Sequence, residues 1–386
     1  MNRLCPICSC ANKTQLYRQN FNNKVIALMD GYDVVLCANC GFVYSDNIPS
    51  QKEFNGYYAA MSKYEFNYDD GIVSENYTEH FEKIVKFVSP YMSDKNAKIL
   101  DIGCSTGGLL ALFKEHGYSN LLGLDPSSTC AASVKRLYGV DAVAGNISDF
   151  YSKETFDLVI LSAVLEHLVD FMPAMNKIRA LLKDNGLLFI EIPDAERFDS
   201  YIFTPFQQFS IEHINYFSQY SIVNLLSSAF FNIVKVLKDE NRVNQTVDPD
   251  LFILSSKSIE QDFAIVRDEA CGPCLRNYID KCRKMDLEIK EKLKEKLKGK
   301  EKIIVWGVGT HTQRLIGSGL DLSRILYFVD SNSRYSGKKI NNVEIRLPKD
   351  IKDDIPILIS TYSYQDEVAR QIKEKLKLPN EIITLY

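Results

Sequence analysis

An acid next to an imidazole, with a phenol three residues later, stands in the middle of the chain. Residues 210–218 read SIEHINYFS, so Glu212 lies beside His213 and Tyr216 follows. A histidine can be neutral near pH 7 and can therefore accept a proton from a substrate. The adjacent carboxylate could orient the ring or bind a substrate hydroxyl group. The stretch predicts either a catalytic base or a structural acid–imidazole pair at the start of a helix.

Four cysteines near the beginning of the chain have the spacing of a metal site. Cys5-Pro-Ile-Cys8 and Cys37-Ala-Asn-Cys40 are CxxC knuckles, and each can turn both of its sulfurs toward one ion. We expect one Zn²⁺ bound by all four thiolates, with Gly41 allowing the tight turn of the second knuckle. Because four thiolates leave no open coordination position, the predicted role of the ion is structural. Buried thiols without a metal are the alternative.

A glycine-rich turn follows a short apolar strand in the next part of the chain. The stretch AKILDIGCSTGGLLALF at 97–113 predicts a strand ending at Asp101, a turn and an amphipathic helix. Glycines let a ligand approach the backbone, and the start of the helix offers free N–H groups. A second predicted strand ends at Asp125, where folds of this type bind a ribose diol. Residues 104–106 interrupt the regular glycine pattern of nicotinamide dehydrogenases.

The alternation of strands and helices continues, with a polar residue near the end of each strand. Asn146 follows a third predicted strand, Ser162 ends a fourth, and a turn and a fifth strand lie at 183–194. In open α/β sheets, ligands bind at the carboxyl ends of the strands. The pattern therefore predicts an α/β fold with a nucleotide-type pocket at this edge. Glu166 and His167 are expected to pack or to cap a helix rather than to take part in chemistry.

The last part of the chain predicts a charged helix followed by a second strand–turn–helix unit. Residues 262–300 carry a partial apolar stripe and a lysine-rich end, which is typical of a solvated connector. The sequence CGPC at 271–274 has redox spacing, but no strand leads into it, so a redox function is the less favoured interpretation. Gly307 and Gly309 match the first two glycines of a dinucleotide turn, whereas Thr312 occupies the third position.

The composition is that of an ordinary water-soluble protein. The 386 residues are enough for two or three domains. A formal net charge of -4 is not the basic charge that is typical of nucleic-acid-binding proteins. No apolar run is long enough to cross a bilayer. The first ten residues lack the apolar core of a signal peptide. We expect a cytoplasmic protein without membrane insertion, whose cysteines are metal ligands or buried thiols.

The motif series resembles the class I S-adenosylmethionine-dependent methyltransferases. The resemblance covers roughly residues 80–255 and rests on DIGCSTG, Asp125, Asn146 and LEHL. It implies a Rossmann-like core in which the glycine loop frames the methionine part of the cofactor, Asp125 binds the ribose and Asn146 lies near the adenine. The predicted cofactor-binding residues are Asp101, Gly103, Cys104, Gly107, Asp125, Asn146 and Ser162.

The order of the parts resembles a narrower group, the sugar-nucleotide C-methyltransferases of deoxysugar biosynthesis. That resemblance implies a zinc-binding segment, a methyltransferase core and a Rossmann-like tail that closes over the nucleotide sugar without a second cofactor. It also implies that His213 is the base, with Glu212 and Tyr216 as its partners, in a pathway such as polysaccharide biosynthesis. The chain departs from the group at 210–211, where the group has Tyr-His, and at 311–312, where it has a lysine.

Three functions therefore stay open. In C-methylation, His213 would remove a proton alpha to a keto group, and tyrosines from 57–77 would stabilise the oxygen charge. In O-methylation of a sugar, the same residue would deprotonate a hydroxyl group. A non-catalytic binding protein that keeps the methyltransferase scaffold is the third.

The same reasoning predicts how the chain is divided, while the oligomeric state is left open. The tyrosine-rich stretch at 54–78 suits the wall or lid of a polar pocket, or a linker folded over the next domain. We expect a zinc-binding segment with these tyrosines at 1–70, a methyltransferase domain at 71–258, a helical connector at 259–300 and a second Rossmann-like domain at 301–386.

Overall fold

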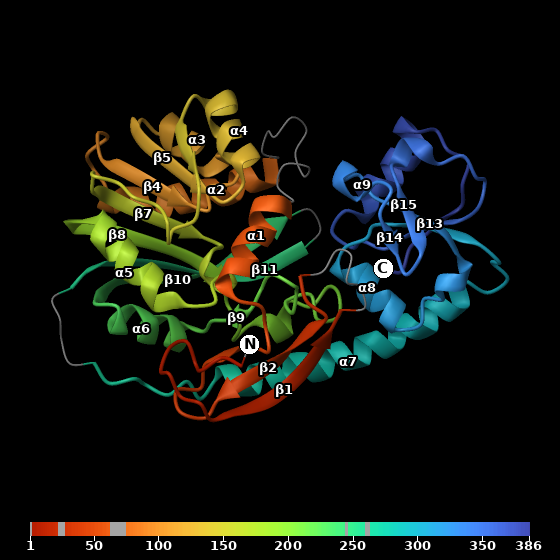
Figure 1. Ribbon diagram of the computed structural model, residues 1–386, viewed down its shortest axis with the longest axis horizontal. Helices are drawn as coiled ribbons and strands as arrows, with labels where there is room; N and C mark the ends of the chain where they lie inside the picture. Colours follow the sequence, from red (N-terminus) through yellow and green to blue (C-terminus); the bar gives the residue numbers. More distant parts are fainter. Residues whose placement is uncertain (1, 22–27, 62–74, 244–245, 259–262) are drawn as a thin grey trace.

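The computed structural model describes residues 2–21, 28–61, 75–243, 246–258 and 263–386 (Figure 1). The strands of these residues form a four-stranded, a seven-stranded and a six-stranded sheet. In the described residues, no helix is long and apolar enough to cross a membrane. Residues 62–74 of the tyrosine-rich stretch lie outside the described part, and its two ends belong to helices α1 (Gln51–Met61) and α2 (Glu75–Val88).

The seven-stranded sheet confirms the predicted α/β series. Its order is β10-β11-β8-β7-β4-β5-β6, and the neighbours from β8 to β6 pair in parallel. The last two strands pair antiparallel, β11 with β8 and β10 with β11. The strands are β4 (Lys98–Ile102), β5 (Asn120–Asp125), β6 (Asp141–Ala144), β7 (Phe156–Ser162), β8 (Leu182–Pro193), β10 (Phe231–Val243) and β11 (Thr246–Lys257).

Helices cover both faces of this sheet, which explains why its central strands are almost continuously apolar. On one face, Ile99 and Leu158 pack with residues of α2 and α3 (Gly108–Glu115). On the other, Leu100 and Val159 pack with α5 (Phe171–Leu181) and α6 (Gln219–Ser228). Helix α4 (Ser128–Tyr138) joins β5 to β6.

Strand β4 is the point at which the chain changes direction across the sheet. The chain passes from β4 to β5 and β6 on one side, and then returns to β7 and β8 on the other. The loops that leave β4 and β7 therefore diverge and open a crevice at their carboxyl ends, the usual ligand site of open α/β sheets. The predicted cofactor residues Asp101, Asp125 and Ser162 all lie at these strand ends.

The small N-terminal sheet is completed by a strand that lies between β8 and β10 in the sequence. Strands β1 (Lys13–Asn20), β2 (Gly31–Cys37) and β3 (Val43–Asp46) form an antiparallel meander. Its last member is β9 (Asn215–Tyr216), in which Tyr216 pairs with Val43. The segment that follows His213 is thus part of the sheet that carries the cysteine knuckles.

The long helix α7 (Cys271–Lys296) connects the N-terminal sheet to the C-terminal unit along one edge of the molecule (Figure 1). Leu275 and Ile279 pack with the aromatic residues beneath the N-terminal sheet, and Ile289 and Leu293 pack with the C-terminal sheet. The predicted apolar stripe is therefore buried at both ends, and α7 is more than a solvated connector.

The C-terminal unit has a mainly parallel sheet of order β14-β15-β13-β12-β16-β17. Only the β14–β15 pair in this described sheet is antiparallel. Helix α8 (Thr310–Gly317) follows the predicted glycine turn, and α9 (Gln365–Arg370) follows β16. The strands are β12 (Ile303–Trp306), β13 (Ile325–Val329), β14 (Lys339–Ile340), β15 (Val343–Arg346), β16 (Ile357–Ile359) and β17 (Ile382–Ile383).

Candidate active site

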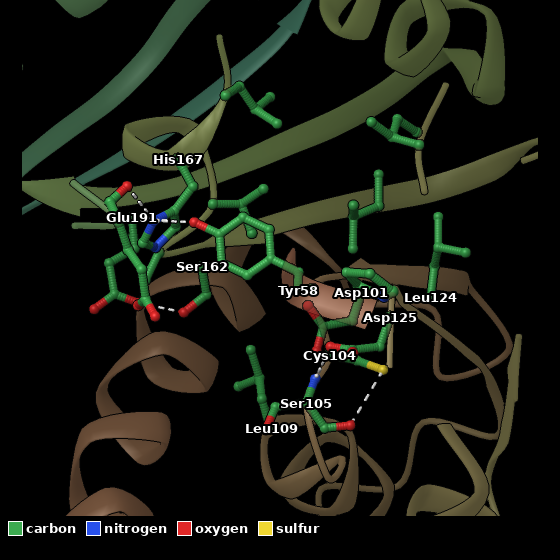
Figure 2. Close-up of a pocket in the computed structure, with 18 of the residues that line it drawn as sticks. Tyr58, Asp101, Cys104, Ser105, Leu109, Leu124, Asp125, Ser162, His167 and Glu191 are labelled. Carbon is green, nitrogen blue, oxygen red and sulfur yellow. Dashed lines mark hydrogen bonds between the residues drawn. The ribbon is translucent and has the colours of Figure 1, made fainter. Parts of the chain in front are cut away.

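A cavity of about 690 Å³ opens at the carboxyl ends of β4, β5 and β7 (Figure 2). Helices α1 and α2, the loop before β9, strands β10 and β11 and the C-terminal unit complete its walls. It brings together predicted residues that lie far apart in the sequence. Those lining it are Asp101, Gly103, Cys104, Asp125, Asn146, Ser162, Glu212 and His213.

Two predicted residues are not among those that line the cavity. Gly107 precedes helix α3 in a left-handed conformation, and its neighbours on both sides reach the cavity. Tyr216 is only 1% exposed and packs among aromatic residues under the N-terminal sheet. Its place in β9 turns the phenol away from the cavity, so a catalytic role for it gains no support from its position.

The glycine loop is shaped by packing. Gly103 has a φ of +78°, and a Cβ atom there would lie 2.6 Å from Cγ2 of Val164. Gly107 has a φ of +91°, and its Cβ would lie 2.8 Å from Cγ1 of Val134. Both positions require glycine because a side chain would be strained and would collide with a neighbouring element. The loop therefore keeps its backbone close to the cavity floor.

Asp125 is fixed in place by two backbone N–H groups. Its Oδ2 atom accepts a hydrogen bond of 2.9 Å from the N–H group of Ser105 (Figure 2). Its Oδ1 atom accepts one of 2.8 Å from the N–H group of Ser127. A carboxylate held at the end of β5 suits the diol of a ribose, as predicted. Cys104 lies beside it, with its buried Sγ atom 3.7 Å from the backbone oxygen of Ser105.

The floor of the cavity is strongly acidic. Burial raises the pKa of Asp101 well above its usual value, and the negative charges of Asp125 and Glu191 raise it further. Ser162, at the end of β7, points toward Glu191 of β8 and donates a hydrogen bond to its carboxylate (Figure 2). A ligand that brings positive charge would relieve the repulsion between these acids.

Hydroxyl groups hold the loop that carries Glu212 and His213. Ser210 Oγ accepts hydrogen bonds from the N–H groups of both residues, at 3.3 and 3.1 Å. The Tyr32 hydroxyl donates to the backbone oxygen of Ser210 at 2.7 Å, and the Tyr216 hydroxyl donates to that of His213 at 3.1 Å. The two tyrosines thus hold the backbone of the loop at Ser210 and at His213. Tyr216 supports the imidazole of His213 only through this backbone contact.

Two tyrosines from the described part of the stretch, Tyr58 and Tyr77, line the cavity, as a pocket wall would. The Tyr57 hydroxyl donates to Glu212 Oε1 at 3.2 Å. The Tyr58 hydroxyl lies 3.1 Å from His167 Nδ1, which also contacts the backbone oxygen of Glu212 at 2.9 Å (Figure 2). Since a carbonyl oxygen only accepts, Nδ1 of His167 carries a proton.

His167 lies in the wall of the cavity. It ends the short 3-10 helix Leu165–His167, lines the cavity, and its ring meets that of His213 edge to face with centroids 5.1 Å apart. The backbone of the LEHL stretch also accepts a hydrogen bond of 3.0 Å from Ile214. These are packing and hydrogen-bond contacts, and the expectation that His167 is structural stays a prediction.

Sequence reasoning missed a buried ion pair in the cavity wall. His80 Nε2 of helix α2 lies 2.5 Å from Glu191 Oε1 of β8, and both side chains are almost completely buried. The one sequence signal was the charged Glu191 within an otherwise apolar strand, because a charge in such a strand is rarely buried without a partner. Nothing in the helical pattern around His80 pointed to a site.

The four predicted metal ligands do come together. The sulfurs of Cys5, Cys8, Cys37 and Cys40 all lie within 4.8 Å of one another, with Sγ–Sγ distances of 3.5 Å for Cys5–Cys40 and 3.4 Å for Cys8–Cys37. Tetrahedral Zn–S bonds of about 2.3 Å place sulfurs about 3.8 Å apart, so the donor set and spacing fit Zn²⁺.

Gly41 is required at the second knuckle for a reason that the sequence did not reveal. Its φ is +76°, and a Cβ atom would lie 2.1 Å from the backbone oxygen of Asp268, which precedes α7. The N–H group of Asp268 in turn donates to the backbone oxygen of Cys40 at 2.9 Å. The knuckle is therefore locked to the segment that leads into α7.

The surroundings of the CGPC sequence give no support to a redox function. It begins α7, and burial raises the pKa of the Cys271 thiol well above its usual value. Burial also raises the pKa of Cys274. Since the thiolate is the reactive form, these thiols lack the lowered pKa of a redox pair.

Together, the sheet order, the crevice at its switch point and the carboxylate at the end of β5 define a nucleotide-type α/β ligand site. Residues 73–236 match a family described as "Methyltransferase domain". This part of the chain is accordingly a class I S-adenosylmethionine-dependent methyltransferase domain. Residues 299–384 match a second family, described as "C2185-like, N-terminal".

Curated relatives are similar over part of the chain. A ubiquinone biosynthesis O-methyltransferase of Rhodopseudomonas palustris (strain HaA2) is 31% identical over 98 residues, which are 24% of this chain and 38% of that protein. An uncharacterized protein of Methanocaldococcus jannaschii is 32% identical over 117 residues, 30% of this chain and 49% of that protein. The chain thus spans less than half the length of each.

Among solved structures, one similar chain is the 1,6-didemethyltoxoflavin-N1-methyltransferase of Burkholderia thailandensis, crystallised with 1,6-didemethyltoxoflavin and S-adenosylhomocysteine. It is 17% identical, with a TM-score of 0.44, and the match covers 57% of this chain and 97% of that one.

Proposed function

We propose that the protein transfers a methyl group from S-adenosylmethionine to a sugar acceptor, with His213 as the base. The observation that carries this proposal is that Glu212 and His213 line the same cavity as Asp101 and Asp125. A proton acceptor and a nucleotide-type site in one cavity are what a methyl transfer to carbon or oxygen requires, because the acceptor has to lose a proton.

The acidic floor suits the proposed cofactor. S-adenosylmethionine supplies an activated methyl group on a positively charged sulfonium, and it also carries an ammonium group. Asp125 binds the ribose hydroxyls, Asn146 lies toward the adenine, and the Gly103 loop leaves room for the methionine part. Asp101, Cys104 and Ser162 border this region. The cofactor's two positive charges offset the repulsion among the buried carboxylates.

His213 does the acid–base work at the other end of the cavity. In C-methylation it takes the proton alpha to a keto group of the sugar, and the methyl group goes to the carbon that lost the proton. Tyr58 and Tyr77 line the cavity, and their hydroxyl groups can donate hydrogen bonds to the developing oxygen charge. In O-methylation His213 takes a hydroxyl proton instead, and no keto group is needed.

A second, smaller cavity of about 220 Å³ supports a hydroxylated acceptor. It shares Ala163, His167, Glu191 and His213 with the main cavity and adds polar side chains such as Gln208. Burial raises the pKa of Asp248, which borders both cavities, to about 6. Carboxyl and amide oxygens are acceptors for sugar hydroxyls, so we place the sugar here and the cofactor over β4 and β5.

The nucleotide of a sugar nucleotide would lie toward the C-terminal unit. Ser363 and Tyr364 bring that unit to the cavity wall, which supports the proposal that residues 301–386 are a second Rossmann-like domain that closes over the substrate. The described lining residues include no lysine or arginine, so a diphosphate would have to stay outside the acidic interior.

The proposed domain division gives the cysteine segment a supporting role. Residues 1–70 would bind Zn²⁺ and hold the His213 loop through β9, residues 71–258 would carry the transfer, and residues 259–300 would connect to the last domain. Zn²⁺ would take no part in chemistry, because four thiolates fill its coordination shell.

The test is a panel of sugar nucleotides and free sugars, with and without a keto group, incubated with enzyme and isotopically labelled S-adenosylmethionine. Mass spectrometry of the products should show a labelled methyl group on one class. A methylated keto sugar that also exchanges its alpha proton with solvent supports C-methylation, and a methylated hydroxyl supports O-methylation. If no sugar is methylated although the cofactor binds, the proposed acceptor is wrong.

A further inference from the structure

The charge of the cavity leaves one end of the proposed cofactor without an obvious partner. Its described lining residues include six carboxylates, three histidines and no lysine or arginine. This suits a sulfonium and an ammonium, but S-adenosylmethionine also carries a carboxylate. A buried carboxylate needs charged or strong hydrogen-bond donors, and an acidic wall repels it. Some residue of the cavity has to supply the donor.

His80 has the right position and bonding to supply it. It lines the cavity close to the carboxyl ends of β7 and β8, through its contact with Glu191, which in turn accepts from Ser162. The Nε2–Oε1 distance of 2.5 Å leaves no room for a metal ion between the two side chains. Because the carboxylate only accepts, Nε2 carries a proton.

The second nitrogen of the ring faces a different situation. Nδ1 of His80 is buried and has no hydrogen-bond partner within the described part of the chain. Burial alone would lower the pKa of His80, but the neighbouring Glu191 carboxylate raises it, and the net shift is upward. In the charged ring Nδ1–H is a strong donor, and leaving such a group buried and unsatisfied costs free energy.

We propose that His80 is a cofactor-binding residue whose Nδ1–H group holds the carboxylate of S-adenosylmethionine. This inference rests on the proposed function, since it needs that cofactor in the cavity. The role of Glu191 is then to keep the imidazole charged and to fix the orientation of the ring through its hydrogen bond with Nε2. Ser162, which occupies the other oxygen of Glu191, completes this support.

The experiment compares two ligands that differ in one group. Decarboxylated S-adenosylmethionine keeps the sulfonium and the amine but lacks the carboxylate. Calorimetry on the intact wild-type protein should show at least about tenfold weaker binding of the decarboxylated ligand, the effect of losing one charged hydrogen bond. His80→Gln should weaken the binding of S-adenosylmethionine by a similar factor while leaving the decarboxylated ligand almost unaffected. His116→Gln, a change at a partly exposed histidine, is the matched control.

The preference for the carboxylate should also depend on pH. A ring that loses its proton while Nε2–H stays on Glu191 turns Nδ1 into an acceptor, which repels the carboxylate. The preference should therefore be full below the raised pKa of His80 and fall as the pH rises through it. The ionisable groups facing His80 are Glu191, Asp239 and Asp250 from the neighbouring strands and Lys83 from its own helix.

Each outcome decides the question. If wild-type protein binds neither ligand, the proposed function itself fails. If it binds S-adenosylmethionine but does not distinguish the decarboxylated form, another group holds the carboxylate and the inference is overturned. An equal loss for both ligands in His80→Gln would make His80 a purely structural residue. If His80→Gln folds poorly, the pH dependence of the preference in wild type decides the question, because a preference that does not fall at high pH excludes an imidazolium donor.

Discussion

The hydroxyl of Tyr216 lies 3.1 Å from the backbone oxygen of His213, on the side of the loop that faces the N-terminal sheet. Burial raises the pKa of Tyr216, so the phenol stays protonated and can donate to this oxygen. A residue that sequence similarity would place among the catalytic groups thus supports the proposed base through its backbone. It also links the four-cysteine segment to the acceptor side of the cavity.

Removing this hydroxyl tests the supporting role. Tyr216→Phe should lower the free energy of unfolding by about 1 kcal/mol, since one buried hydrogen bond is lost. It should lower kcat while the affinity for S-adenosylmethionine stays the same, because Tyr216 is not among the described residues that line the cavity. Unfolding in denaturant and steady-state kinetics measure both effects. An unchanged kcat in a destabilised variant would limit Tyr216 to folding.

His213→Ala tests the base directly. A general base contributes roughly 10²–10⁴ in rate, so kcat should fall by about that factor with little change in cofactor affinity. The wild-type rate should also fall at acid pH, because a protonated ring cannot accept a proton. His116→Ala, at a partly exposed histidine, is the control and should keep full activity. A folded His213→Ala protein with normal kcat would exclude the base role.

The ribose contact is tested at Asp125. Asp125→Ala should weaken cofactor binding by roughly 2–4 kcal/mol, at about 1–2 per charge-assisted hydrogen bond. Asp125→Asn keeps the shape and an acceptor oxygen, so its loss should be smaller. Asp141→Asn, at the exposed start of β6, serves as the control. Calorimetry with S-adenosylhomocysteine gives the affinities, and equal values for all four proteins would place the cofactor elsewhere.

The packing role of Gly103 has a well-matched control. Gly103 and Gly337 have φ values of +78° and +77°, but a Cβ atom would meet Val164 only at the first and nothing within 4 Å at the second. Alanine at either position carries the left-handed strain of roughly 1–2 kcal/mol. Gly103→Ala should cost more than Gly337→Ala in thermal unfolding and should also weaken cofactor binding. Equal effects would show that the Val164 side chain can move away from the added methyl group at little cost in free energy.

Metal analysis tests the cysteine site. Freshly purified protein prepared without chelators should contain about one zinc per chain, as one four-thiolate site requires. Cys37→Ser should lose the metal and expose the first segment to proteases, whereas Cys10→Ser, outside the four-sulfur cluster, should do neither. Because β9 belongs to the N-terminal sheet, activity should fall as well. Zinc-free wild-type protein with an intact first segment would contradict the assignment.

The features that the sequence predicted correctly are those written in contiguous residues. The strand that ends beside Asp101, the turn at Gly103 and the strand that ends at Asp125 each lie within one short window of apolar periodicity and turn residues. The two cysteine knuckles are local in the same sense, since each sets the direction of its own two sulfurs. Such signals depend on backbone conformation and side-chain type, and both can be read from neighbouring residues.

What only the tertiary structure decided is which of these segments meet. His80 and Glu191 stand 111 positions apart, and neither has a local pattern that names the other. Tyr216 was predicted to be a catalytic partner of His213, but its pairing with Val43 places it in the aromatic core. The fold also sets the His167 ring against that of His213, a contact that no local pattern indicated. Contacts of this kind arise from the packing of whole elements against one another, and a single sequence carries that information only through the fold it adopts.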